Sequence, residues 1–215
     1  MTLIKSISGI RGTIGGEVGD CLTPVDIVKF TSAYAVRIYE RIPGMEKYKV
    51  VVGRDARLSG KMVDSVVCGT LMACGIDVVN AGLASTPTTE MAVIFEKADG
   101  GIILTASHNP KQWNALKLLN EKGEFLDAEE GAKLLAVAEA ENFDFADVDN
   151  LGTIEYKDFT QQHIDAVLAQ PLVDVEAIYK AGFKVALDAV NSVGGVIMPK
   201  LLEALGVQCE CVHCE

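Results

Sequence analysis

The sequence contains no hydrophobic run long enough to cross a membrane and few aromatic or basic residues. Aromatic side chains make up 6% of the 215 residues, with a single tryptophan. Nineteen lysines and arginines against 30 aspartates and glutamates give a net charge of -11. This acidic balance argues against a nucleic-acid partner, and the lack of a membrane-spanning apolar run argues against a membrane partner.

Signatures of several common enzyme classes are also missing. The dinucleotide pattern G-x-G-x-x-G does not occur. One glycine-rich segment looks like a P-loop, but six residues separate Gly53 from Gly60, and Met62 stands where a serine or threonine is needed. Ser107 and His108 are adjacent and lack a G-x-S-x-G elbow. On an extended backbone such neighbours point apart, so a serine hydrolase is disfavoured.

The amino terminus has no secretory signal, and six cysteines are scattered along the chain. Both observations favour a protein kept in the reducing cytoplasm. Cys68 and Cys74 fall in a predicted helix and are interpreted as core residues. The hydrophobic content of 49% with 23% charged residues is that of a globular chain with enough apolar material for a core.

A cluster near the carboxyl end, Cys209, Cys211, His213 and Cys214, suggests zinc, which binds cysteine and histidine. Its spacing fits no standard ligand pairing, and Cys209 and Cys211 alternate as strand residues do. We therefore favour a strand of an interrupted domain over a metal site. His163 lies on a polar helical stretch and is predicted to be solvated.

The most informative stretch, residues 100–117, joins an apolar run to a short polar loop. Ile102 to Leu104 is typical of a strand buried on both faces. The hexapeptide T-A-S-H-N-P follows at residues 105–110 and ends in an Asn-Pro turn signal. Ligands bind at the carboxyl edge of open α/β sheets, so Ser107 is predicted to face a crevice.

Basic residues gather in or beside glycine-rich and Asn-Pro loops. A local positive pocket in an acidic protein is suited to phosphate esters. The alternative is that these are ordinary surface charges. The residues concerned are Arg11, Arg54, Arg57, Lys61, His108, Lys111 and Lys117.

Alternating strand and helix patterns predict an α/β fold with an open, mostly parallel sheet and helices on both faces. Thr23 and Asp26 form a capping box, as do Asp127 and Glu130, and Ser59 is expected to cap a helix. The predicted strands are 2–8, 49–52, 76–79, 102–104, 115–119, 183–188 and 207–212. The predicted helices are 24–41, 60–74, 88–96, 127–141, 156–169, 173–180 and 197–205.

The chain is predicted to divide into two parts. Residues 142–155 are polar and acidic and are interpreted as a linker, which places a first domain at 1–154. Residues 155–215 contain a strand, a turn, a helix and a further strand. This second part is predicted to be the start of a similar α/β domain, because so small a sheet would leave an apolar edge exposed.

Three motifs resemble those of the α-D-phosphohexomutases, the superfamily of phosphoglucomutase, phosphomannomutase and phosphoglucosamine mutase. The hexapeptide around Ser107 is followed at the family's spacing by Asn114 and Lys117. Residues 9–12, G-I-R-G, resemble the first active-site loop, and residues 53–60, G-R-D-A-R-L-S-G, resemble the second motif of domain one.

The sequence departs from the family pattern at three places. Residues 6–8, S-I-S, replace the usual Phe-Gly-Thr-Asp. Residues 115–116, Ala-Leu, stand where many members have glycine and an aromatic residue, and Ser192 follows Asn191 where glycine is typical. The resemblance covers almost the whole chain but only half or less of a complete phosphohexomutase.

The resemblance implies reversible phosphoryl transfer between Ser107 and a hexose phosphate through a bound bisphosphate. Mg²⁺ would bind an oxygen of the Ser107 phosphate, with its other ligands outside this chain, and hexose 1,6-bisphosphate would activate the full enzyme. The implied catalytic residues are Ser107, His108, Lys117 and Arg11. The implied supporting residues are Gly9, Gly12, Arg54, Asp55, Arg57 and Asn109.

The loops that select the sugar, bind its phosphate and complete the metal site in the family are not found in the sequence, so the remaining domains of the same polypeptide are its expected partners. The isolated chain is therefore expected to show little or no mutase activity. Glucose, mannose and glucosamine phosphates all remain open as substrates. The alternative from another class is a non-catalytic module of the same fold that binds a phosphate or a partner chain.

Overall fold

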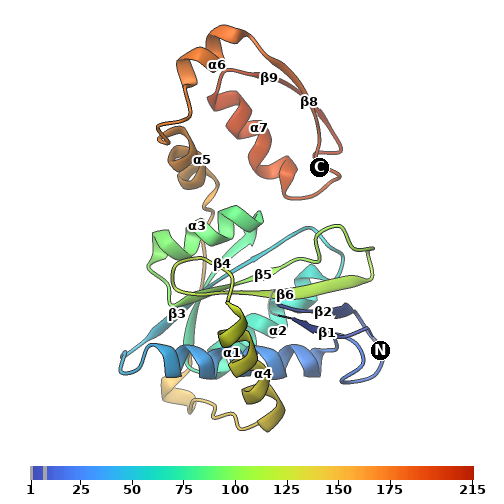
Figure 1. The fold of residues 1–215 in the computed structure, drawn as a ribbon, viewed down its shortest axis with the longest axis vertical. Coiled ribbons are helices and arrows are strands. Elements are labelled where there is room, and N and C mark those ends of the chain that lie inside the picture. The colour runs from blue at the N-terminus through green and yellow to red at the C-terminus, as the bar shows by residue number, and fades with distance from the viewer. Residues whose placement is uncertain (1, 7–8) are drawn as a thin grey trace.

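The computed structural model describes residues 2–6 and 9–215. Most of them form one seven-stranded sheet, ordered β1-β2-β6-β5-β3-β4-β7, with helices on both faces (Figure 1). Ile7 and Ser8, which complete the first predicted strand, lie outside the described residues. The strands are β1 Ile4–Ser6, β2 Gly9–Thr13, β3 Tyr48–Arg54, β4 Ile76–Leu83, β5 Gly100–Leu104, β6 Trp113–Leu119 and β7 Ile154–Tyr156.

The strand directions confirm the predicted mostly parallel sheet. β5, β3, β4 and β7 pair in parallel. β6 runs antiparallel to both β5 and β2, so β2 shares the direction of the parallel strands. Only β1 and β6 of the seven described strands run the other way, because short connections join each of them to an antiparallel neighbour.

Three helices cover one face of the sheet: α1 Pro24–Arg41, α2 Gly60–Ala73 and α4 Ala128–Ala140 (Figure 1). Their apolar residues share a core with Val50, Val52 and Leu104 of the central strands. The predicted capping box begins α1, since the Thr23 and Asp26 side chains each accept a backbone N–H of the other. Within the described chain, no helix has the length and apolar character needed to cross a membrane.

Two predicted caps differ in detail. Ser59 precedes α2, but its side chain makes no capping bond and instead accepts a hydrogen bond from Asn114. Asp127 caps α4 by accepting the Glu130 backbone N–H, which is one of the two bonds of the predicted capping box. The Glu130 carboxylate pairs with Arg37 of α1, which ties α4 to the neighbouring helix.

The opposite face carries α3 Thr86–Glu96 and, beyond it, α5 Thr160–Leu168. A second core joins Val51 and Ile103 of the sheet to Val93 of α3 and Phe159, the residue that precedes α5. His163 of α5 is buried against this layer, with its Nδ1 atom 3.0 Å from Thr88 Oγ1. The prediction that His163 is solvated is therefore wrong, because α5 packs onto α3 and removes it from water.

The predicted linker is fastened to the first sheet. The Ala146 and Gly152 N–H groups donate to carbonyl oxygens at the end of α2, and a short 3₁₀ turn spans Val148–Asn150. β7 then pairs with β4. Tyr156, predicted to begin a helix, lies in this strand, and the helix begins at Thr160. We keep the division near residue 154 as a proposal, with β7 spanning it.

The remaining residues form a smaller unit of α6 Val175–Ala181, β8 Lys184–Asp188, α7 Gly194–Ala204 and β9 Gln208–Val212. β8 and β9 pair in parallel around the α7 crossover. Figure 1 shows this unit on the α3 side of the main sheet. The strand, turn, helix and strand occur where the sequence predicted them.

Candidate active site

The hexapeptide loop begins where β5 ends, at Leu104, and leads into β6. All five residues of β5 are buried, so the loop extends from a rigid strand at the carboxyl edge of the sheet, as predicted. Ser107 has a φ of 54°, in the left-handed region that few non-glycine residues adopt. Its backbone N–H donates to Thr105 Oγ1 over 3.1 Å, and this bond holds the turn in that conformation.

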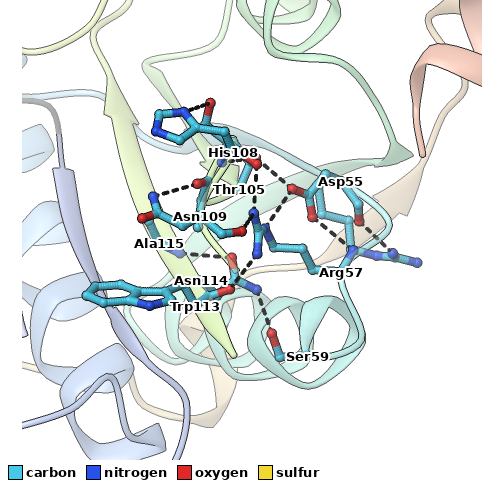
Figure 2. A network of polar contacts seen from close by, with 12 residues as sticks. Asp55, Arg57, Ser59, Thr105, His108, Asn109, Trp113, Asn114 and Ala115 are labelled. Atoms are coloured by element: carbon cyan, nitrogen blue, oxygen red, sulfur yellow. Dashed lines mark hydrogen bonds and ion pairs between the residues drawn. The ribbon is translucent and has the colours of Figure 1, made fainter. Parts of the chain in front are cut away.

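Arg57 binds the hexapeptide loop and the residues after it through four backbone carbonyl oxygens. Its Nη1 atom donates to the carbonyl oxygens of Pro110 and Trp113 at 2.9 and 3.0 Å. Its Nη2 atom donates to those of Ser107 and Asn109 at 2.7 and 2.8 Å. Figure 2 shows Arg57 between Asp55 and the loop residue Asn109. Because a guanidinium presents its donors in a fixed plane, these four bonds fix the path of the loop.

Asp55 joins this arginine to the loop. One Asp55 oxygen accepts from Arg57 Nε at 3.2 Å and from Thr105 Oγ1 at 2.6 Å, and the other accepts the Arg57 backbone N–H. Arg54 donates to the Asp55 carbonyl oxygen. Asp55 and Arg57 therefore brace the loop directly, whereas Arg54 acts one contact further away.

Two further members of the support, Thr105 and Asn114, belong to the predicted motifs but were not among the predicted site residues. Thr105 links Asp55 to the Ser107 N–H. Asn114, fully buried, donates to Ser59 Oγ over 2.9 Å and accepts the Ala115 N–H. Both residues belong to motifs that the sequence revealed, but their partners lie some 50 residues away and give no local signal.

Residues 9–12, predicted to be an active-site loop, instead lie in a strand, β2, which pairs with β1 and β6. Gly9 has a φ of 120°, and a Cβ there would lie 2.2 Å from the Leu116 carbonyl oxygen. A Cβ at Gly12 would lie 3.0 Å from the Leu22 nitrogen. The two glycines therefore allow a close approach of backbones, which brings Arg11 beside the loop.

Arg11 and Lys117 reach the same side of the sheet. Arg11 is opposite Ala115 in the β2–β6 pair, and Lys117 is opposite Ile103 in the β6–β5 pair. Cross-strand neighbours and alternate residues share a face, and Ile103 faces α3. Both cations therefore lie on the α3 face of the sheet, at the end where the hexapeptide loop turns.

A cavity of about 140 Å³ opens between the loop and the two strands. Six of the ten predicted site residues line this cavity. The other four, Gly12, Arg54, Asp55 and Arg57, do not. Lys61 and Lys111, also grouped with the basic loops, do not line it. The lining residues are Ser6, Gly9, Arg11, Thr105, Ala106, Ser107, His108, Asn109, Ala115 and Lys117.

The charges in the cavity wall are cationic. Among the described residues that line it, none is an aspartate or glutamate. Within the described chain Arg11 forms no ion pair, and Lys117 lies 5.7 Å from the centre of the Phe125 ring, with no carboxylate within ion-pair distance. Burial raises the pKa of Glu90 on α3, and the nearby Lys117 ammonium opposes that rise. Two cations without an ion-pair partner in the described chain favour an anionic ligand here.

Ser107 and His108 approach each other more closely than expected. Ser107 Oγ lies 3.5 Å from His108 Nδ1, because the left-handed backbone of Ser107 removes the extended geometry that points neighbours apart. The expectation of divergent side chains is wrong. A hydrolase triad still lacks its third member, since no carboxylate of the described chain binds the His108 ring.

Fold and cavity together define an α/β protein with a serine and unpaired cations in a pocket at the carboxyl edge of its sheet. Residues 3–145 match the family model described as phosphoglucomutase/phosphomannomutase, alpha/beta/alpha domain I. The chain belongs to this family. The resemblance drawn from its three motifs is confirmed.

Curated relatives carry related names. A Thermococcus kodakarensis protein named phosphoglucomutase/phosphomannomutase is 35% identical over 92% of this chain and 42% of its own length. A Sulfurisphaera tokodaii protein named phosphoglucosamine/phosphogalactosamine mutase is 32% identical over 92% of this chain and 41% of its own length. The chain thus spans about two fifths of the length of these relatives.

Solved structures share the fold. A protein of Thermus thermophilus described as a candidate phosphomannomutase matches 99% of this chain and 46% of its own, with a TM-score of 0.82 and 26% identity. A phosphoglucomutase/phosphomannomutase family protein of Burkholderia thailandensis matches with a TM-score of 0.74 over 100% of this chain and 45% of its own, at 24% identity. The second likeness concerns the fold alone.

Proposed function

We propose that the protein containing this chain is a hexose phosphate mutase, with Ser107 as the phosphoryl carrier. The observation that carries the proposal is the cavity in which Ser107 meets Arg11 and Lys117 without a carboxylate in the described wall. The names of the relatives support an enzyme of the mutase class. Interconversion of hexose 1- and 6-phosphates is a reaction that would use both the serine and the cations of this cavity and that agrees with the names of the relatives.

The proposed reaction has two transfers. In the first, the bond between phosphorus and Ser107 Oγ breaks and a bond forms from phosphorus to the free hydroxyl oxygen of the sugar phosphate. The hydroxyl loses its proton and Ser107 Oγ gains one. The resulting bisphosphate reorients within the site. Its other phosphoryl group is then transferred to Ser107, the sugar oxygen gains a proton and Ser107 Oγ loses one. Charge neutralisation and positioning dominate such transfers.

Each neighbour of Ser107 has a proposed part. Arg11 and Lys117 stabilise the equatorial oxygens of the transferring group, where negative charge is spread. His108, 3.5 Å from Ser107 Oγ, orients the group and holds the proton that the serine oxygen gains or loses. Asp55 and Arg57 keep the loop in position, a contribution that depends on geometry rather than on charge.

The described residues allow a limited test of the proposed magnesium site. No group of three or more histidine, cysteine, aspartate or glutamate side chains in the described chain is arranged to hold a metal ion. A phosphate on Ser107 would offer a hard oxygen ligand, which suits Mg²⁺. This chain would then supply one ligand, and the ion would supply charge neutralisation of the phosphoryl group.

Two alternatives are retained. The Sulfurisphaera tokodaii relative is named for amino sugars, which favours phosphoglucosamine mutase as the second candidate activity. A non-catalytic module that binds a phosphate or a partner chain would use the same cations without transferring a group. Phosphorylation of Ser107 separates this last class from the mutases.

The deciding experiment is intact-mass spectrometry of the endogenous protein from its native cells, with fragmentation to locate any phosphoryl group. We expect one phosphoryl group on Ser107, and its loss when the protein is incubated with excess hexose phosphate. The matched variant Ser65→Ala removes an exposed serine of α2, whose hydroxyl donates within its own helix, and should leave that group in place. An endogenous protein with unmodified Ser107 and no mutase turnover would favour the binding module.

A further inference from the structure

The mutase site does not use the cysteine cluster at the end of β9. Cys209 and Cys211 are separated by one residue on this strand, and their Sγ atoms lie 3.8 Å apart. Cys211 and Cys214 line one surface cavity together with His213. Cys211 is thus the central thiol of three.

The geometry of the cluster does not favour zinc. No three or more metal-binding side chains of the described chain are arranged to hold an ion. His213 instead directs its Nδ1 atom to the Asp188 carboxylate, 3.3 Å away. Three cysteines lie close together on β9 and the turn that follows it, without a geometry for metal, and this arrangement permits thiol–disulfide chemistry.

The backbone decides which pair can be joined. Cys209 and Cys211 lie on an extended strand, where two residues span about 6.6 Å, near the upper limit for the Cα atoms of a disulfide. After Val212 the chain turns, because His213 has a φ of 49°. The turn brings Cys214 back to Cys211 in the spacing C-x-x-C, which is typical of redox-active pairs.

Position and accessibility assign different roles to the two thiols. Cys211 is exposed, so it meets a dissolved oxidant first. Cys214 is half-buried against the first turn of α7, where a Cβ at Gly195 would lie 2.7 Å from the Cys214 carbonyl oxygen. Desolvation and the neighbouring Cys211 raise the pKa of Cys214, which suits it to the second, resolving step.

We propose that Cys211 and Cys214 form a reversible disulfide when the protein meets a low-molecular-weight disulfide such as oxidised glutathione. Cys211 attacks the glutathione disulfide and releases one glutathione. Cys214 then attacks the mixed disulfide and releases the second. Two electrons pass to glutathione, and the two protons of the cysteine thiols end on the two glutathione thiols.

The disulfide would also restrain the neighbouring loop after β8. Val190 and Asn191 have φ values of 47° and 51°, a strained conformation for the branched side chain of valine. Asn191 N–H donates to the His213 carbonyl oxygen over 2.6 Å, and Ala189 N–H donates to that of Val212 over 3.1 Å. Joining Cys211 to Cys214 therefore stabilises the turn to which this loop is bonded.

The test uses the full 215-residue chain in a glutathione redox buffer, quenched with acid and alkylated. All three thiols fall in the single tryptic peptide that follows Lys200, so fragmentation of that peptide assigns the linkage. We expect a peptide two hydrogen atoms lighter, alkylated only at Cys209. Hydrogen exchange at the Asn191 amide should become slower on oxidation and return to its original rate on reduction.

Matched variants complete the design. Cys211→Ser and Cys214→Ser should abolish the linkage, whereas Cys209→Ser and the distant Cys21→Ser should keep it. A Cys209–Cys211 linkage, or three alkylated thiols under strongly oxidising buffer, would overturn the proposal. So would stoichiometric Zn²⁺ that protects the three thiols of the reduced chain from alkylation, since that result would establish a metal site.

Discussion

Arg57 Nη2 lies 2.7 Å from the carbonyl oxygen of Ser107 and donates a hydrogen bond to it. The same guanidinium also holds three other carbonyl oxygens of the loop and its exit. An arginine 50 residues away in the sequence therefore determines where the serine hydroxyl stands. Because lysine keeps the positive charge of Arg57 but not its donor geometry, a substitution here can test the position of the loop separately from its electrostatics.

Arg57→Lys keeps the charge but removes the fixed fork of donors. Under the proposed function we expect kcat to fall on the order of 10²-fold, because small misplacements of a reacting group are costly. The KM for hexose phosphate should change little, since Arg57 does not line the cavity. The control is Arg54→Lys, which loses a single bond to Asp55. Equal losses in both variants would contradict a specific role for the Arg57 fork.

Gly9→Ala should destabilise the fold more than Gly15→Ala. Both glycines have positive φ, but only at Gly9 would the new Cβ meet backbone, 2.2 Å from the Leu116 oxygen, whereas nothing lies within 4 Å at Gly15. Backbone strain alone costs on the order of 1–3 kcal/mol in each variant. Urea unfolding would measure the difference. Similar free energies of unfolding would show that β2 can shift away from β6.

Lys117→Gln should slow phosphoryl transfer to and from Ser107 by on the order of 10²-fold, because it removes a charge from the proposed transition-state environment. Single-turnover measurement of Ser107 phosphorylation by hexose bisphosphate would test this. Lys122→Gln, at an exposed turn after β6, is the matched control. If the control slowed transfer equally, the effect would belong to overall charge and not to the cavity.

Stability should fall as the pH drops below about 6.5, the ordinary pKa of histidine, with part of the change due to His163. Burial lowers the pKa of His163 in the folded chain. The unfolded chain therefore binds the proton first, so the stabilising contribution is complete above the unfolded pKa and declines as pH falls toward the folded one.

Urea unfolding at about pH 8 and about pH 5.5, on either side of the ordinary histidine pKa, would isolate this contribution. His163→Gln retains a side chain able to bond Thr88 but cannot titrate in this range, so its stability should depend less on pH. His213→Gln is the control, since His213 is exposed beside Asp188. An unchanged pH dependence in His163→Gln would refute the assignment.

Local patterns in the sequence were enough for most elements. The apolar run at Ile102–Leu104, the Thr23–Asp26 capping box and the strand–helix–strand at the end of the chain all lie where they were predicted. These features depend on residues close together in sequence, so they can be inferred without the fold. The motif around Ser107 likewise pointed to the site before any geometry was known.

Contacts between distant residues could not be inferred in that way. The polar surroundings of His163 suggested a solvated helix, yet packing of α5 onto α3 buries it. Tyr156 and the acidic segment before it looked like linker and helix, but pairing with β4 makes a seventh strand. In each case burial against a distant element outweighed the local pattern.

The sequence by itself determined the alternation of strands and helices, the buried β5 and the polar loop that carries Ser107, because short-range periodicity and turn chemistry encode them. Tertiary structure alone decided that Arg11 and Lys117 share one cavity with that serine and that Arg57 fixes the loop. β6 lies between β2 and β5 and pairs antiparallel with both. This pairing brings two charges from distant parts of the chain into one cationic site.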